Sequence, residues 1–195
     1  MSRDRSKGRT QGPFGDLYRY VPRGGETKGV ERFLRFIATT LLHPGWQAMF
    51  IFRLSQVFHR LKLFPISWCL YRFNMHLFSI DIPPAVRLGR GAWVPHPIGI
   101  VIARDAQIGD EATIFQNVTI GGRGAPPTLG NGVVLGAGAC VLGPAILGDR
   151  VRVAANSLVT RSFAGGMTVA GVPARRLDEF ADDAISASVQ SKDTD

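Results

Sequence analysis

An aliphatic side chain recurs every six residues between Ile82 and Val159. The series consists of Ile82, Leu88, Val94, Ile102, Ile108, Ile114, Ile120, Leu129, Leu135, Val141, Leu147, Val153 and Val159. The spacing slips twice, by two residues after Val94 and by three after Ile120. A period of six matches neither an α-helix nor an alternating strand. It is typical of a hexapeptide β-helix, in which each hexad forms one side of a triangular prism and three hexads form one coil. The sequence therefore predicts a mainly β fold, a parallel β-helix.

A second small or β-branched residue follows most of these aliphatic residues four positions later. These second residues are Val86, Ala92, Ala106, Ala112, Val118, Val133, Ala139, Ala145, Val151 and Ser157. Glycine often follows the aliphatic residue directly, as at Gly89 and Gly109. We expect the aliphatic side chains to fill the narrow bore, the smaller ones to fill the remaining space, and the glycines to occupy the corners.

Composition divides the chain of 195 residues into four segments. Residues 1–27, rich in Gly, Pro, Arg and Lys, are predicted to be a flexible basic lead-in. Residues 28–80 have the apolar spacing of helices and are predicted to form an α-helical cap domain. The hexads occupy a β-helix domain over residues 81–176, and residues 177–195 form an acidic C-terminal tail.

Three helices are predicted within the cap. Residues 30–41 place apolar side chains at i, i+3 and i+4, as an amphipathic helix does. A second helix is expected over 44–61, opened by a proline, and a third over 65–78. Because the third helix is apolar nearly all round, we expect it to be buried against the other helices or against another subunit.

The formal net charge of +8 is unevenly distributed, since residues 1–36 hold nine Lys and Arg against four acids. Such a basic arm can attract nucleic acid, anionic lipid or a phosphorylated ligand, or can remain a solvated arm. The chain has no helix-turn-helix or RNP motif, which argues against a nucleic-acid-binding protein.

The apolar stretch over 64–80 is interrupted by proline, arginine and histidine, so no membrane-spanning segment is predicted. Cys69 and Cys140 are far apart and are predicted to be free thiols of a cytoplasmic protein.

His96 is the one histidine on the predicted prism, and it lies in the first slip of the hexad series. Extra residues at a slip bulge from the wall, where they can reach a ligand. A zinc site of three histidines is excluded, so we expect no metal.

Asp81 precedes His96 by fifteen residues. Since a coil takes about eighteen residues, the two can lie near the same edge on adjacent turns. A carboxylate behind an imidazole fixes its tautomer and raises its basicity. The spacing alone leaves this pairing open.

The second slip lies in the segment that begins Gly121-Gly122. Adjacent glycines leave backbone N–H groups unobstructed, as a site that stabilises an oxyanion requires. An ordinary glycine-rich turn would have the same composition, so this pattern allows both interpretations.

Over residues 43–176 the chain resembles the bacterial serine O-acetyltransferases. The matching segments are His-Pro-Gly-Trp-Gln-Ala at 43–48, Asp81-Ile82 with Pro84, His96 through Ile102, Val-Thr-Ile-Gly-Gly at 118–122, Leu-Gly-Ala-Gly-Ala at 135–139 and Gly-Val-Pro-Ala-Arg at 171–175. The hexads and the last segment recur in many hexapeptide acyltransferases. The His-Pro-Gly segment together with Asp81 and His96 is more specific.

The resemblance implies a left-handed β-helix, acetyl-CoA as donor and direct transfer of acetyl to a hydroxyl group. It implies that His96 is the general base and that Asp81 orients it. The N–H of Gly122, beside Gly121, matches the oxyanion donor. The positions matching the coenzyme A groove are Ala137, Arg152 and Ala155, and Arg152 with Arg161 or Arg175 could meet its phosphates. Prisms of this kind pack as homotrimers, which can pair into a dimer of trimers; the third helix and Trp93 are the predicted contacts.

The chain departs from the family pattern at one residue and in one three-residue segment. Pro95 stands where the family has aspartate, and Ala125-Pro126-Pro127 stands where it has the Arg-His-Pro that grips the amino-acid acceptor. The charged amino and carboxylate groups of serine need counter-charges, and residues 125–127 no longer offer the family's three candidates. The acceptor is therefore either L-serine, giving O-acetylserine for cysteine biosynthesis, or a sugar in exopolysaccharide or capsule biosynthesis. A non-catalytic β-helix scaffold is the third alternative. The chain ends in Asp195 rather than isoleucine, so we expect no complex with cysteine synthase.

Overall fold

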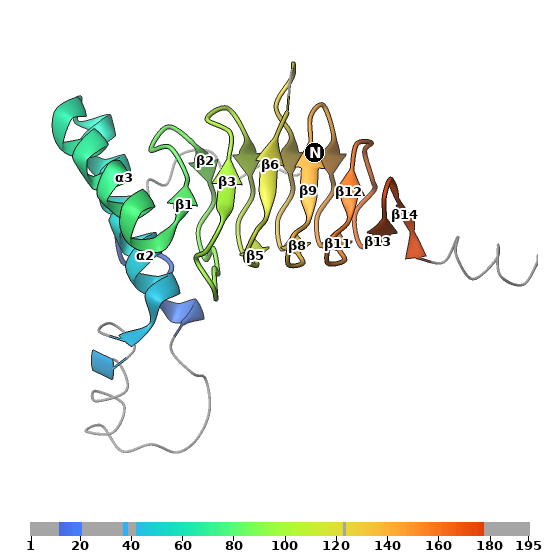
Figure 1. The fold of residues 1–195 in the computed structure, drawn as a ribbon, viewed down its shortest axis with the longest axis horizontal. Coiled ribbons are helices and arrows are strands. Elements are labelled where there is room, and N and C mark those ends of the chain that lie inside the picture. The colour runs from blue at the N-terminus through green and yellow to red at the C-terminus, as the bar shows by residue number, and fades with distance from the viewer. Residues whose placement is uncertain (1–11, 21–36, 39–41, 123, 178–195) are drawn as a thin grey trace, which may run out of the picture.

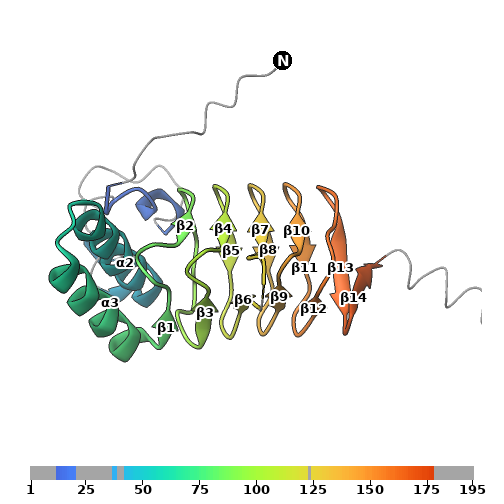
Figure 2. The same cartoon turned by 90° about the horizontal axis from the view of Figure 1, so that it is seen from above.

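A triangular β-helix with a helical cap at one end is the architecture of the computed structural model, which describes residues 12–20, 37–38, 42–122 and 124–177 (Figure 1). The coils are stacked in one row between the helices and the C-terminal strands (Figure 2). The cap contains η1 (Leu17–Arg19), α2 (Pro44–Arg60) and α3 (Phe64–Phe78). The predicted second and third helices are thus confirmed, whereas the helix expected over 30–41 lies almost wholly outside the described residues.

Three sheets form the walls of the prism, and we name them A, B and C. Sheet A contains β1 (Ile80–Asp81), β3 (Ile100–Ile102), β6 (Thr119–Gly121), β9 (Cys140–Leu142) and β12 (Leu158–Val159), in that order. Sheet B contains β2 (Arg87–Leu88), β4 (Gln107–Ile108), β7 (Thr128–Leu129) and β10 (Ile146–Leu147). Sheet C contains β5 (Thr113–Ile114), β8 (Val134–Leu135), β11 (Arg152–Val153), β13 (Thr168–Gly171) and β14 (Ala174–Arg176). Neighbouring strands come from successive coils and run parallel, except that β14 is antiparallel to β13. The chain is a left-handed parallel β-helix with a helical cap, which confirms the predicted fold class.

The bore of the prism is filled as the hexad pattern predicts. All thirteen aliphatic residues of the series are buried, and so are all ten of the smaller residues that follow them. The two slips appear as two outward loops. One lies at the corner that leads from sheet C to sheet A, before β3, and the other at the corner that leads from sheet A to sheet B, after β6. We call these the C–A corner and the A–B corner.

A buried ion pair fixes the cap to the first coil. The carboxylate of Asp16 bonds the Arg53 guanidinium at 2.8 Å, and both side chains are almost completely buried, with exposed fractions of 0% and 1%. The guanidinium also donates to the carbonyls of Leu88, at 2.8 Å, and Gly89, at 2.5 Å. Arg53 therefore joins an N-terminal segment, α2 and the prism.

The segment 12–20 caps the open edge of sheet C on the first coil. The N–H of Ala92 donates to Asp16 at 3.1 Å, and the N–H of Val94 donates to the Tyr20 hydroxyl at 2.8 Å. No earlier coil exists to accept these donors, and a buried N–H without a partner is costly. This segment belongs to the predicted flexible lead-in, and nothing in its composition indicates that it docks on the prism.

The outer side of α3 is apolar and uncovered in the single chain. Only Ser67 and Asn74 of this helix are buried. Its large exposed side chains are Phe64, Ile66, Trp68, Phe73 and Leu77. The expected burial against the other helices is therefore limited to one narrow side. Among the described residues, no helix has both the length and the hydropathy that crossing a membrane requires.

Candidate functional site

His96 lies in the outward loop at the C–A corner, and its side chain is exposed. The loop closes tightly, since the N–H of Ile98 donates to the His96 carbonyl at 2.9 Å. Gly99 completes the turn at φ +66°, and a Cβ there would lie 2.2 Å from the Asn117 side-chain oxygen on the next coil. The positive φ therefore favours glycine at this position, where it ends the loop that carries His96.

Asp81 lies on the outer surface of sheet A. Its neighbours Ile80 and Ile82 are buried, so strand alternation directs the Asp81 carboxylate outward. The hydroxyl of Tyr71, on α3, donates to Asp81 Oδ1 at 2.6 Å. Burial and this hydrogen bond raise the pKa of Tyr71 to about 12, so the phenol is protonated at neutral pH. No motif in the sequence indicates this role for Tyr71.

The two candidate catalytic residues occupy neighbouring strands of sheet A. Asp81 pairs in register with Val101, five residues after His96, on the adjacent coil. In the described residues the Asp81 carboxylate bonds Tyr71, and no hydrogen bond joins it to the His96 ring. The structure thus brings the residues to one region without pairing them directly.

A second histidine lies beside His96. His43, the N-cap residue of α2, packs its ring edge-on against Tyr20, with centroids 5.0 Å apart. Its Nδ1 is buried and has no hydrogen-bond partner in the described part of the chain. Burial lowers the pKa of His43, and the nearby His96 imidazole lowers it further. In the sequence His43 was only part of a matching segment. Its buried, unpaired nitrogen depends on long-range packing and could not be predicted.

Gly121 and Gly122 lie at the A–B corner, at the end of β6. The Gly121 carbonyl accepts from the N–H of Gly143 at 2.8 Å, which anchors the start of the loop. Gly122 has φ +128°, and its N–H has no backbone partner among the described residues. That N–H is geometrically free to donate to an oxyanion.

The remaining predicted site residues fall into two groups. Ala137 and Ala155 occupy the C–A corner, the corner of His96, and Arg152 points outward from sheet C beside them. Arg161 follows β12 at the A–B corner, with its guanidinium 5.2 Å from the Phe163 ring centroid, and Arg175 lies on β14. Within one chain, the predicted donor groove and His96 therefore lie at the C–A corner, whereas the glycine pair lies at the A–B corner.

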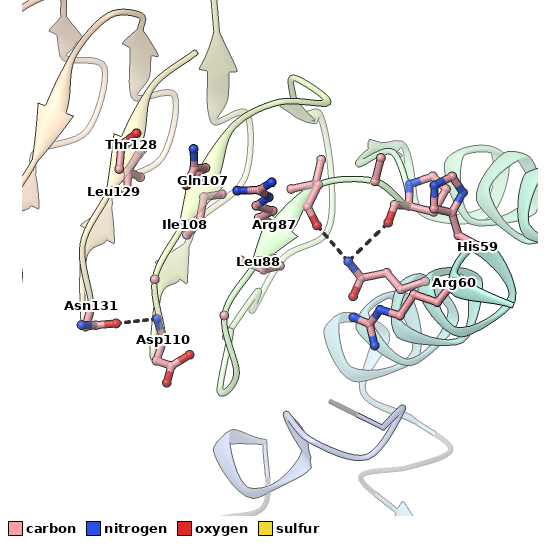
Figure 3. Close-up of a pocket in the computed structure, with 16 residues that line it drawn as sticks. His59, Arg60, Arg87, Leu88, Gln107, Ile108, Asp110, Thr128, Leu129 and Asn131 are labelled. Atoms are coloured by element: carbon pink, nitrogen blue, oxygen red, sulfur yellow. Dashed lines mark hydrogen bonds between the residues drawn. The ribbon is translucent and has the colours of Figure 1, made fainter. Parts of the chain in front are cut away.

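A groove of about 640 Å³ lies between the C-terminal end of α2 and sheet B (Figure 3). Its polar lining includes Arg60 on the helix side and Arg87 and Gln107 on the sheet side. None of the predicted site residues lines this groove, so its size alone does not identify the reacting centre. No group of three His, Cys, Asp or Glu side chains that could hold a metal ion occurs in the described ranges.

Comparison with known proteins shows which family has this fold. Residues 126–161 match the bacterial transferase hexapeptide (six repeats) family. The chain is 39% identical over 142 residues to the serine acetyltransferase of Helicobacter pylori strain J99, covering 70% of this chain and 83% of that protein. The structure of the Brucella abortus serine acetyltransferase in complex with coenzyme A aligns with a TM-score of 0.73 and 31% identity, covering 85% of this chain and 66% of that one. The soybean serine acetyltransferase complexed with serine aligns with a TM-score of 0.73 and 29% identity, covering 85% and 68%.

The fold and these matches define an acyltransferase of the hexapeptide-repeat class. Within that class the chain belongs to the serine acetyltransferase family.

Proposed function

We propose that this protein transfers the acetyl group of acetyl-CoA to the hydroxyl of L-serine, giving O-acetylserine for cysteine biosynthesis. The observation that carries the proposal is the match to a serine acetyltransferase at 39% identity over 70% of this chain and 83% of that protein. The position of Asp81, His96 and the Gly121-Gly122 pair on sheet A and its two corners supports it.

In the proposed reaction His96 accepts the proton of the acceptor hydroxyl as the hydroxyl oxygen attacks the thioester carbonyl carbon. The Gly122 N–H donates to the developing oxyanion. When the carbon–sulfur bond breaks, His96 returns the proton to the coenzyme A thiolate. Asp81 orients the imidazole, and no covalent enzyme intermediate forms.

The proposed donor site follows the C–A corner. Ala137 and Ala155 leave room along this edge because their side chains are small. Arg152, with Arg175 of the same chain or with Arg161 on the A–B corner of a neighbouring copy, would bind the coenzyme A phosphates, since a guanidinium suits phosphate oxygens. The solved Brucella relative in complex with coenzyme A supports this ligand. Acetyl-CoA is available in the cytoplasm, and a reducing cytoplasm suits the free thiols of Cys69 and Cys140.

A homotrimer is part of the proposal, because one chain does not assemble the site. His96 precedes β3, and Gly122 follows the adjacent parallel strand β6. At about 3.3 Å per residue, the two positions are about 15 Å or more apart along sheet A. A base and an oxyanion donor must both reach one carbonyl, so the C–A corner of one copy would face the A–B corner of another. The exposed apolar side of α3 supports such packing.

A sugar hydroxyl is the second candidate acceptor. Residues 124–127 of the A–B loop are Gly, Ala, Pro and Pro, so the described part of this loop offers no charged side chain to the amino and carboxylate groups of serine. A neutral sugar does not need such counter-charges.

The test measures release of free thiol from acetyl-CoA with each acceptor. The proposal expects turnover with millimolar-range L-serine and little with neutral monosaccharides. Turnover with sugars and none with serine would show that a sugar is the acceptor. No thiol release with serine or with sugars would favour a non-catalytic scaffold.

A further inference from the structure

The contact between α3 and the candidate carboxylate is held firmly from both sides of Tyr71. Ser67, one turn before Tyr71, donates to the Ser55 carbonyl at 2.9 Å, and Asn74 donates to the Ala48 carbonyl at 3.1 Å. Both side chains are buried, and both acceptors belong to α2. A single residue, Ser79, connects the end of α3 to β1. The helix that carries Tyr71 is thus fixed relative to the strand that carries Asp81.

The Tyr71 side chain also lines a small pocket between α3 and the first coil. This pocket has a volume of about 60 Å³, and Trp68, His59 and Arg104 line it as well. The Trp68 ring packs edge-on against the Tyr71 ring, with centroids 5.3 Å apart. The ring contact with Trp68 and the hydrogen bond to Asp81 Oδ1 both favour the orientation in which the phenol hydroxyl points at the carboxylate.

We propose that Tyr71 is a positioning residue that holds the Asp81 carboxylate in the orientation that His96 requires. The 2.6 Å bond occupies Oδ1 and leaves Oδ2 to accept the ring N–H of His96. A carboxylate without this bond would rotate and share its acceptor oxygens with solvent. Tyr71 does not lose its proton, so it contributes order and no proton transfer. This inference rests on the proposed function, because it assumes that Asp81 and His96 are the catalytic pair.

The proposal requires that Tyr71 act only through Asp81. The test is a double-mutant cycle of Tyr71→Phe, Asp81→Asn and the combined variant in the full chain, with thiol release as the assay. Tyr71→Phe keeps the ring and its packing and removes only the donor. We expect kcat to fall about tenfold, the size of one charge-assisted hydrogen bond, with KM for acetyl-CoA unchanged. Asp81→Asn should lower kcat by at least about a hundredfold, and adding Tyr71→Phe to it should change nothing further.

Tyr18→Phe is the matched control, because the Tyr18 hydroxyl also donates to a carboxylate, that of Glu111, on a corner without any candidate site residue. It should leave kcat unchanged. Additive losses in the combined variant would mean that Tyr71 acts structurally and would overturn the inference, as would full activity of Tyr71→Phe. Full activity of Asp81→Asn would overturn both the inference and the catalytic pair. A loss with Asp81→Asn alone leaves the proposed function standing and removes only the role of Tyr71.

If Tyr71→Phe failed to fold, the pH titration of the Tyr71 phenol would test the contact with Asp81 instead. Removing the Asp81 charge should move the titration of one tyrosine in Asp81→Asn to lower pH, because that charge contributes to its raised pKa. An unchanged titration would refute the contact.

Discussion

Substituting Asp16 tests how the cap is joined to the β-helix. Asp16→Ala leaves the Arg53 guanidinium buried, with an exposed fraction of 1%, and without its counter-charge. Breaking a buried pair by removing one partner costs about 3–5 kcal/mol. Arg53 retains the Leu88 and Gly89 carbonyls as acceptors. The buried N–H of Ala92, however, also loses its acceptor, so we expect a value in the middle of the range, about 4 kcal/mol. For a chain of this size each kcal/mol lowers Tm by about 2–4 °C, which predicts a fall of about 8–16 °C.

The assay is thermal unfolding followed by circular dichroism at one fixed protein concentration, because assembly makes Tm concentration-dependent. Asp110→Ala is the matched control. It removes a pair with Arg90 whose side chains are 59% and 34% exposed, and surface pairs are worth at most about 1 kcal/mol. Equal shifts in the two variants would show that the Asp16–Arg53 pair is not a buried connection, and the account of the cap would be wrong.

Two further predictions concern pH and assembly. The pKa of His43 is lower in the folded protein than in the unfolded chain. As pH falls below about 6.5, the unfolded chain therefore binds a proton at His43 before the folded protein does. The free energy of unfolding that depends on the neutral His43 is complete above that pH and is lost below it. His43→Gln should therefore flatten the fall of Tm between about pH 6.5 and 5, and an unchanged slope would count against the buried, neutral imidazole. Phe73 and Leu77 are 54% and 56% exposed, one turn apart on α3, and Phe73→Lys with Leu77→Lys should convert the proposed trimer to monomer in light scattering. A trimeric mass for this double variant would exclude this side of α3 from the interface.

The periodic part of the fold could be predicted because each hexad repeats one local requirement. Every coil buries its aliphatic residues in the bore, as Ile108 is buried on its own coil. The local sequence is therefore enough to predict where such a residue lies. The two slips also located the outward loops, since extra residues cannot be accommodated in the bore. Pro44 and Pro65 marked the starts of α2 and α3 because proline is favoured in the first turn of a helix.

Contacts between distant segments were not predictable. Asp16 and Arg53 are 37 residues apart, and nothing local in either segment indicates that a charge will be buried there. Tyr71 lies on a helix that is apolar nearly all round, and only its packing on α2 decides which side faces Asp81. The separation of His96 from Gly122 became visible only when the strands were placed, because both belong to similar outward loops in the sequence.

The central claim is that His96 is the base of an acetyl transfer, and His96→Ala tests it most directly. The measurement is thiol release from acetyl-CoA with L-serine, together with calorimetric binding of coenzyme A to the same preparation. The account predicts turnover lower by at least about a hundredfold, the usual scale for a lost general base, with coenzyme A binding retained. Turnover close to that of the unmodified protein, with binding intact, would contradict it.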